Sequence, residues 1–172
     1  GSGLVGSEMC IRDRLAGIVL DTKNFTMRTG GRTFEAAAFL RRAGADTAEV
    51  KKLFQNDLEG TIAKYAIIQN AKLYREKIAI AVVDHTVGRI VAAQAADELL
   101  NIIGIDTSFV LYPDGERVII SARSMGDTNV QVILEKLGGG GNAAAAGGQI
   151  SGKSLSQVAT ELTQAIDQYL EG

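Results

Sequence analysis

The chain has 172 residues, of which 46% are hydrophobic and 22% charged, and its formal net charge at pH 7 is −2. This balance is typical of a soluble globular protein rather than a disordered one. The acidic charge excludes a basic surface that would hold long nucleic acid by charge alone, but it leaves room for a short or cyclic nucleotide in a local pocket. Cys10 is the only cysteine, which excludes an internal disulfide and a thiolate zinc site.

The N-terminal segment, residues 1–14, follows neither the helical nor the strand period, and VGSEMCIRD within it resembles a translated sequencing adapter. We therefore expect a non-native leader outside the fold. The apolar run at 15–20 fits a buried strand or the last turns of a buried helix, because six residues are too few for periodicity to decide. Asp21 ends this run, and its carboxylate is a weak candidate for a hard-metal ligand or for a helix cap.

Helical patterns continue to residue 75. The sequence at 33–44 predicts a helix with Thr33 as its N-cap, and Asp46 and Glu49 form a capping pair for the next helix. We interpret 47–75 as a helical linker between two domains.

Short strands and helices alternate after this linker. Their order is strand, helix, strand, strand, helix, strand, helix, which predicts a compact α/β domain with a mixed central sheet flanked by helices. The expected elements are 78–83, 89–103, 107–112, 117–123, 129–137, 145–150 and a last helix that begins at the capping box Ser154-x-x-Gln157.

The glycine run Gly138–Gly141 is the strongest feature of the sequence. Consecutive glycines cost backbone entropy, and we expect no packing purpose for them in a helix or a strand. They suit a backbone that approaches a ligand closely or presents N–H groups to an anion. A flexible loop is the alternative, but the neighbouring small residues favour tight packing.

The segment Gly147–Ser154 matches the P-loop pattern G-x-x-x-x-G-K-S. A P-loop needs an apolar strand before it and the rest of a nucleotide-binding sheet after it, whereas only 18 residues follow Ser154. We therefore interpret Lys153 and Ser154 as the start of a helix.

Arg123 ends a predicted strand, with Ser124 and other small polar residues nearby. An arginine fork binds phosphate with two N–H groups, so this position suits phosphate binding. An exposed ion pair is the alternative. The only histidine, His85, lies in a predicted turn and receives no role.

Two segments, in this order, resemble the DHH phosphodiesterases. LAGIVLDTKNFTMRTGGRTFEAAAFLRRAGADT is similar to the last metal-ligand motif of the family, and ISARSMGDTNVQVILEKLGGGGNAAAAGG is similar to its DHH-associated C-terminal domain. The detailed sequence looks closest to the GdpP-type enzymes, which are membrane-anchored and cleave cyclic di-AMP to pApA with manganese. The resemblance implies a helical remnant of the DHH catalytic domain at 15–46 and a substrate-binding domain at 76–172.

The same resemblance assigns roles to individual residues. Asp21 would be a manganese ligand. The residues that would bind substrate are Arg123, Ser124, Gly139, Gly140, Gly141 and Asn142. Asn142 stands where the family has histidine, and unlike histidine it carries no charge and does not titrate near neutrality.

The family's other metal ligands, a D-x-D and a D-H-H triplet, lie before residue 15 and are absent here. Two-metal hydrolysis needs both ions, so we expect no complete catalytic set and an inactive, soluble fragment. The full-length protein would act at the cytoplasmic face of the bacterial membrane.

The alternatives are a nano-RNA or pApA exonuclease of the same superfamily and a non-catalytic RNA-binding module. The expected partner is a cyclic dinucleotide or a short oligonucleotide, and a homodimer stays open.

Overall fold

The computed structural model describes residues 2–25 and 29–172, with side chains from Cys10 onward in these ranges. The chain forms two compact units that divide between Asn56 and Asp57. Within the described ranges, no helix is both long and apolar enough to cross a lipid bilayer.

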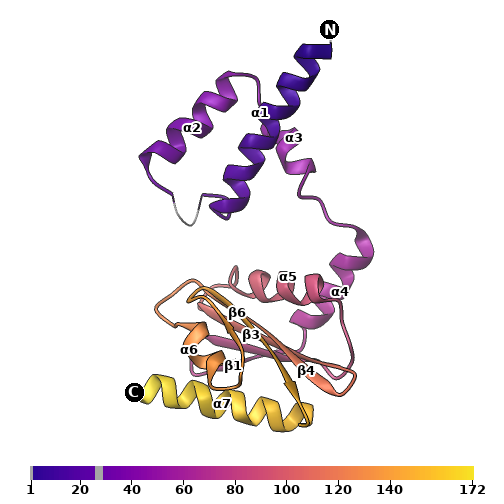
Figure 1. Cartoon of the computed structure of the whole chain (residues 1–172), viewed down its shortest axis with the longest axis vertical. Coiled ribbons are helices and arrows are strands. Elements are labelled where there is room, and N and C mark those ends of the chain that lie inside the picture. The colour runs from indigo at the N-terminus through magenta and orange to yellow at the C-terminus, as the bar shows by residue number, and fades with distance from the viewer. Residues whose placement is uncertain (1, 26–28) are drawn as a thin grey trace. The chain divides into compact units, whose positions relative to one another are not determined.

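The first unit consists of three helices, α1 (Ser2–Asp21), α2 (Gly31–Arg42) and α3 (Thr47–Lys52) (Figure 1). They enclose a small core of Leu15, Leu40, Ala45 and Val50. The apolar run at 15–20 is thus helical, which decides between the two alternatives for it.

Helix α1 also runs through most of the segment that was expected to lie outside the fold. Ile11 packs against the core of the first unit, so the expectation that the whole segment lies outside the fold is wrong. The physical reason is that adding residues to a helix that has already formed and packed costs little. Residues without an amphipathic pattern can therefore join it. The non-native origin of residues 1–14 stays a prediction.

The helices of this unit begin at ordinary N-cap residues, but the N-cap of α2 is not the residue that the sequence predicted. Gly30 is the N-cap of α2, and Thr33 lies three residues further on, where its hydroxyl accepts from the Gly30 N–H at 3.4 Å. Thr33 is therefore not the N-cap. Asp46 does cap α3, since its Oδ1 accepts from the Ala48 N–H at 2.8 Å.

The second unit begins with helix α4 (Leu58–Ile68) and contains a six-stranded sheet in the order β1-β2-β3-β4-β6-β5. Strands β2 and β3 are parallel and the other neighbouring pairs are antiparallel, so the predicted mixed α/β fold is confirmed. The strands are β1 (Ala71–Tyr74), β2 (Ile78–Val82), β3 (Thr107–Asp114), β4 (Arg117–Ser124), β5 (Gly140–Gly141) and β6 (Ala145–Ser151). The remaining helices are α5 (Arg89–Leu99), α6 (Val130–Glu135) and α7 (Leu155–Glu171).

Strand β1 corrects the prediction of a helical linker over 47–75. Its four residues pair with β2 through a tight turn in which Arg75 and Glu76 both take left-handed conformations, with φ of 54° and 65°. If the helix continued instead, the N–H and C=O groups along this edge of β2 would have no partner from β1. Pairing the two strands satisfies them. Helix α4 packs against α5 and therefore belongs to the second unit. The division between the units, at Asn56 and Asp57, falls inside the predicted linker.

Helices cover both faces of the sheet (Figure 1), and a separate apolar core lies on each face. Helices α6 and α7 pack against Val118, Ile120 and Ala122 of β4, together with Phe109 and Leu111 of β3. Helices α4 and α5 pack on the opposite face, against Ala81, Val110 and Tyr112. Each fully buried large side chain of this kind contributes roughly 1.5–3 kcal/mol to folding. Because successive side chains along β4 point to opposite faces of the sheet, every second residue of this strand faces α5.

Candidate functional site

Four residues of β4 point toward the α5 side of the sheet, since side chains alternate along a strand. Cα pairing aligns them with residues of β6, in the pairs Arg117–Ser151, Ile119–Gln149, Ser121–Gly147 and Arg123–Ala145. We call the patch formed by Ser121, Arg123, Ala145, Gly147 and Gln149 the small-residue sheet face. Its members are half-buried or exposed, whereas Val110, opposite Ser121 on β3, is fully buried under α5. A ligand can therefore approach the backbone here.

Arg123 is held at one end of this face by two contacts. Its Nε lies 3.3 Å from Oδ1 of Asp97 on α5, and its Nη1 donates to the Ala122 carbonyl at 2.8 Å. The ion pair that the sequence left as an alternative is thus present. These two contacts use Nε and Nη1, so Nη2 is the guanidinium nitrogen whose N–H groups can turn to an anion.

Sequence reasoning missed Asp97. It lies in the polar stripe of a helix and has no sequence motif around it. Only the packing of α5 on β4 brings it to Arg123.

Ser124 lies beside Arg123 in sequence, but its side chain is on the opposite face of the sheet. It is 3% exposed, and its N–H donates to the Ala144 carbonyl at 2.9 Å. Its Oγ has no hydrogen-bond partner among the described residues. The structure therefore does not bring the Ser124 hydroxyl to the Arg123 guanidinium. An unpartnered buried hydroxyl costs about 1–3 kcal/mol.

The glycine run begins by ending helix α6. Gly138 has a φ of 83°, and its N–H donates to the Glu135 carbonyl at 3.1 Å. The Gly139 N–H donates to the Leu134 carbonyl at 2.8 Å, which completes a Schellman motif. Two N–H groups of the run are therefore used within the fold and cannot bind an anion at the same time.

The rest of the run packs closely against a second pair of glycines. A Cβ on Gly139 would lie 2.5 Å from the Gly147 carbonyl oxygen and 3.1 Å from the Gly148 Cα. A Cβ on Gly141, whose φ is 148°, would overlap the Ala145 carbonyl oxygen. The expectation that the run serves no packing purpose is therefore wrong, because β5 and β6 approach more closely than side chains allow.

Gly140 is the exception in the run. Its φ is not in the left-handed region, and nothing lies within 4 Å of an added Cβ. It is exposed, so it has room for a ligand nearby but no steric need to be glycine.

Asn142 shapes the turn that joins β5 to β6. Its Oδ1 accepts from the N–H groups of Ala144 and Ala145, both at 2.9 Å, and its own N–H donates to the Ala145 carbonyl at 2.8 Å. The residue is exposed. Its side-chain oxygen therefore has a structural task, and the amide nitrogen is the group left to face a ligand.

Asp21 is the last residue of α1 and is exposed, so it is not the N-cap of a helix. The negative end of a helix dipole disfavours a carboxylate at this position, and a cation would offset that cost. Across residues 10–25 and 29–172, whose side chains the structure describes, no group of three or more His, Cys, Asp or Glu could hold a metal ion. The described residues therefore do not fit a complete metal centre.

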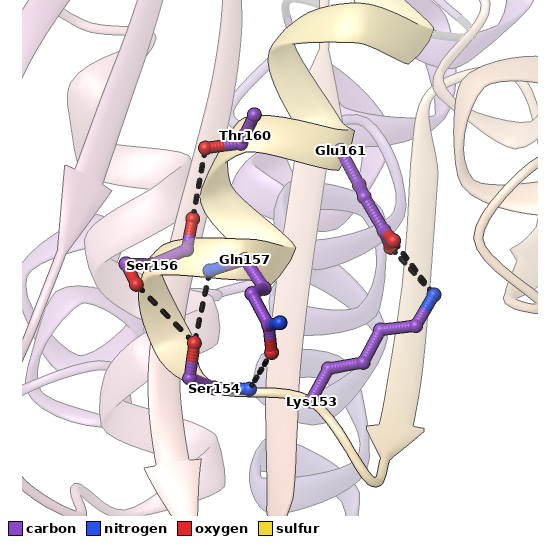
Figure 2. Close-up of polar contacts among 6 residues, drawn as sticks. All are labelled: Lys153, Ser154, Ser156, Gln157, Thr160 and Glu161. Carbon is purple, nitrogen blue, oxygen red and sulfur yellow. Dashed lines mark hydrogen bonds and ion pairs between the residues drawn. The ribbon is translucent and has the colours of Figure 1, made fainter.

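The P-loop lookalike is the start of a helix, as predicted. Gly147 and Gly148 lie within β6 rather than in a loop, and Lys153 forms an ion pair with Glu161 at 2.7 Å (Figure 2). The Ser154 hydroxyl accepts from the Gln157 N–H at 3.2 Å, and the Gln157 side chain accepts from the Ser154 N–H at 2.8 Å. This is the predicted capping box, so neither Lys153 nor Ser154 is poised for a phosphate.

Comparison with known proteins places the second unit in a family. The model of the DHHA1 domain matches residues 75–172. The cyclic-di-AMP phosphodiesterase GdpP of Bacillus subtilis is 45% identical over 92% of this chain and 25% of its own length. The cyclic-di-AMP phosphodiesterase PdeA of Listeria monocytogenes is 44% identical over 92% of this chain and 24% of its own length. The chain thus spans about a quarter of the length of these relatives.

A solved structure supports the fold independently. An exopolyphosphatase-related protein from Bacteroides fragilis superposes with a TM-score of 0.78 over 88% of this chain and 48% of its own, at 21% identity. Because the family model matches more than half of the residues, from the β1–β2 turn to the C-terminus, this chain belongs to the DHHA1 domain family.

Proposed function

We propose that this chain supplies the substrate-binding part of a phosphodiesterase that hydrolyses cyclic di-AMP to pApA. The observation that carries the proposal is the geometry of Arg123. Its guanidinium is held beside a sheet face of small residues through Nε and Nη1, and Nη2 takes no part in these two contacts. A charge-assisted contact of this kind suits a phosphodiester oxygen.

The relatives support the choice of substrate. GdpP and PdeA are both named cyclic-di-AMP phosphodiesterases, and each matches 92% of this chain. Gly147 and Ala145 of the small-residue sheet face are half-buried and carry little or no side chain, which suits the approach of the sugar–phosphate backbone of a dinucleotide. Gly140 is exposed and pairs with Gly147 of this face across β5 and β6. The exposed Asn142 follows β5 in the turn to β6.

We also propose that the chain is inactive by itself and that hydrolysis by the full-length protein depends on manganese. Asp21 would contribute one ligand, and a single carboxylate cannot hold the two ions that such hydrolysis requires. Incubating the purified chain with cyclic di-AMP and manganese, and measuring pApA by chromatography, tests this directly. Turnover above the buffer control would contradict the proposal.

Calorimetric titration with cyclic di-AMP tests the binding site. Loss of a charge-assisted phosphate contact costs about 1.5–3 kcal/mol, so Arg123→Ala should bind roughly 10- to 100-fold more weakly. Arg117→Ala is the matched control, because Arg117 lies on the same strand and face but donates to Gln149 at 3.0 Å. We expect it to bind within about threefold of the wild type. Equal affinities of Arg123→Ala and the wild type would remove Arg123 from the site.

A related candidate is an exonuclease that acts on pApA or nano-RNA. The same titration with pApA separates the two functions. Tighter binding of pApA than of cyclic di-AMP would favour the exonuclease.

A further inference from the structure

The ion pair between Asp97 and Arg123 joins two elements that are otherwise held by apolar contacts. Asp97 lies on α5 and Arg123 near the end of β4, and the contact joins Oδ1 to Nε at 3.3 Å. The Arg123 side chain is 18% exposed and that of Asp97 is 45% exposed. The pair is therefore at the boundary between the core under α5 and solvent.

We propose that Asp97 is a positioning residue for Arg123, and that it fixes the guanidinium so that its Nη2 edge faces the phosphate of the substrate. This inference rests on the proposed function. Asp97 binds Nε, and the Ala122 carbonyl binds Nη1. Two contacts on different nitrogens set the plane of a rigid fork, whereas either contact alone would leave it free to turn.

The benefit of this arrangement is that the arginine is ordered before the ligand arrives. A long side chain that becomes fixed only on binding loses rotamer freedom at that moment, and affinity falls accordingly. Fixing the side chain in advance removes part of that cost. We therefore expect loss of the Asp97 carboxylate to weaken binding about three- to tenfold.

A competing effect has the opposite sign. The Asp97 carboxylate is negative and repels a phosphate near Arg123. Solvent screens this repulsion, because the Asp97 side chain is nearly half exposed, while the contact with Nε is direct. Positioning should therefore outweigh repulsion. The affinity of Asp97→Ala for cyclic di-AMP distinguishes the two effects, because it falls if positioning dominates and rises if repulsion dominates.

The test is a double-mutant cycle on cyclic di-AMP affinity, measured by calorimetry for the wild type, Asp97→Ala, Arg123→Ala and the double variant. Asp97→Ala should bind about three- to tenfold more weakly than the wild type, and it should change nothing in the Arg123→Ala background. Asp97→Asn keeps an oxygen close to Nε but removes the negative charge, so it should recover only part of the loss. Glu98→Ala is the control, because Glu98 neighbours Asp97 on α5 but pairs with Lys64 at 3.6 Å.

A second measurement does not depend on the ligand. In a nitrogen-15 spectrum, the Arg123 Nε–H should give a resolved signal in the wild type and in Glu98→Ala, and the signal should broaden or vanish in Asp97→Ala.

The outcomes separate the two proposals. If Arg123→Ala weakens binding but Asp97→Ala binds as tightly as the wild type or more tightly, the positioning role is wrong and the proposed function stands. An equal loss from Asp97→Ala in both backgrounds would also exclude the role, since the effect would not pass through Arg123. A wild-type chain that does not bind cyclic di-AMP would overturn both.

Discussion

Substituting Gly139 by alanine tests whether the glycine run is dictated by packing. The added Cβ would lie 2.5 Å from the Gly147 carbonyl oxygen and 3.2 Å from its carbonyl carbon. These atoms belong to the backbone of β6, which is paired on its other side with β4 and cannot move away freely. Overpacking of this kind costs about 1–3 kcal/mol. At roughly 4 °C per kcal/mol for a domain of this size, the melting midpoint should fall by about 4–12 °C.

The matched control is Gly140→Ala, one residue further along. Nothing lies within 4 Å of its added Cβ, and its φ is not left-handed. Its stability should change little or rise by up to about 1 kcal/mol, because alanine restricts the unfolded chain. Urea unfolding followed by circular dichroism measures both variants. If Gly139→Ala proved as stable as Gly140→Ala, the steric explanation of the run would be refuted.

Three further predictions concern polar contacts of the second unit. Ser154→Ala removes the cap of α7 and should cost about 0.5–2 kcal/mol in urea unfolding; no change would show that the cap is dispensable. Asn142→Ala removes the acceptor of two backbone N–H groups and should lower stability by about 1 kcal/mol, whereas Asn142→Asp keeps the acceptor and should lose less. The Tyr74 hydroxyl donates to Asp167 at 2.6 Å; this bond lowers the pKa of Asp167 and raises the pKa of Tyr74. The stabilisation from this bond is fully present above the ordinary pKa of an aspartate, and it is lost as the pH falls through the lowered pKa of Asp167. At high pH it is lost as the pH rises through the raised pKa of Tyr74. Unfolding of Tyr74→Phe and the wild type between pH 3 and pH 7 should show a difference that shrinks toward acid, and a constant difference would contradict the assignment.

Much of the second unit could be predicted from local patterns. Strands β2, β3, β4 and β6 and the capped helix α7 follow from apolar runs and turn residues, which carry their own signals. Strand β1 could not be predicted in this way. Only Gln69 and Asn70 separate its four residues from α4, and they become a strand because β2 offers them backbone partners.

The site shows the same limit more sharply. The partner of Arg123 depends on where α5 packs, which no local pattern encodes. Two other features were readable in principle. Neighbouring residues in a strand point to opposite faces, so Arg123 and Ser124 could not have shared one site through their side chains. The glycines at 138–141 and 147–148 also form two clusters, and each explains the other once they are placed side by side.

The way the sheet ends has a consequence for how copies of this domain meet. Strand β5 has only two residues, and at the other edge β1 has four, among them the exposed Lys72. Short edges and an exposed lysine give an incoming strand little to pair with, because a few hydrogen bonds cannot offset the cost of fixing it. Any self-association of this domain should therefore proceed through side chains rather than by extending the sheet from one molecule to the next.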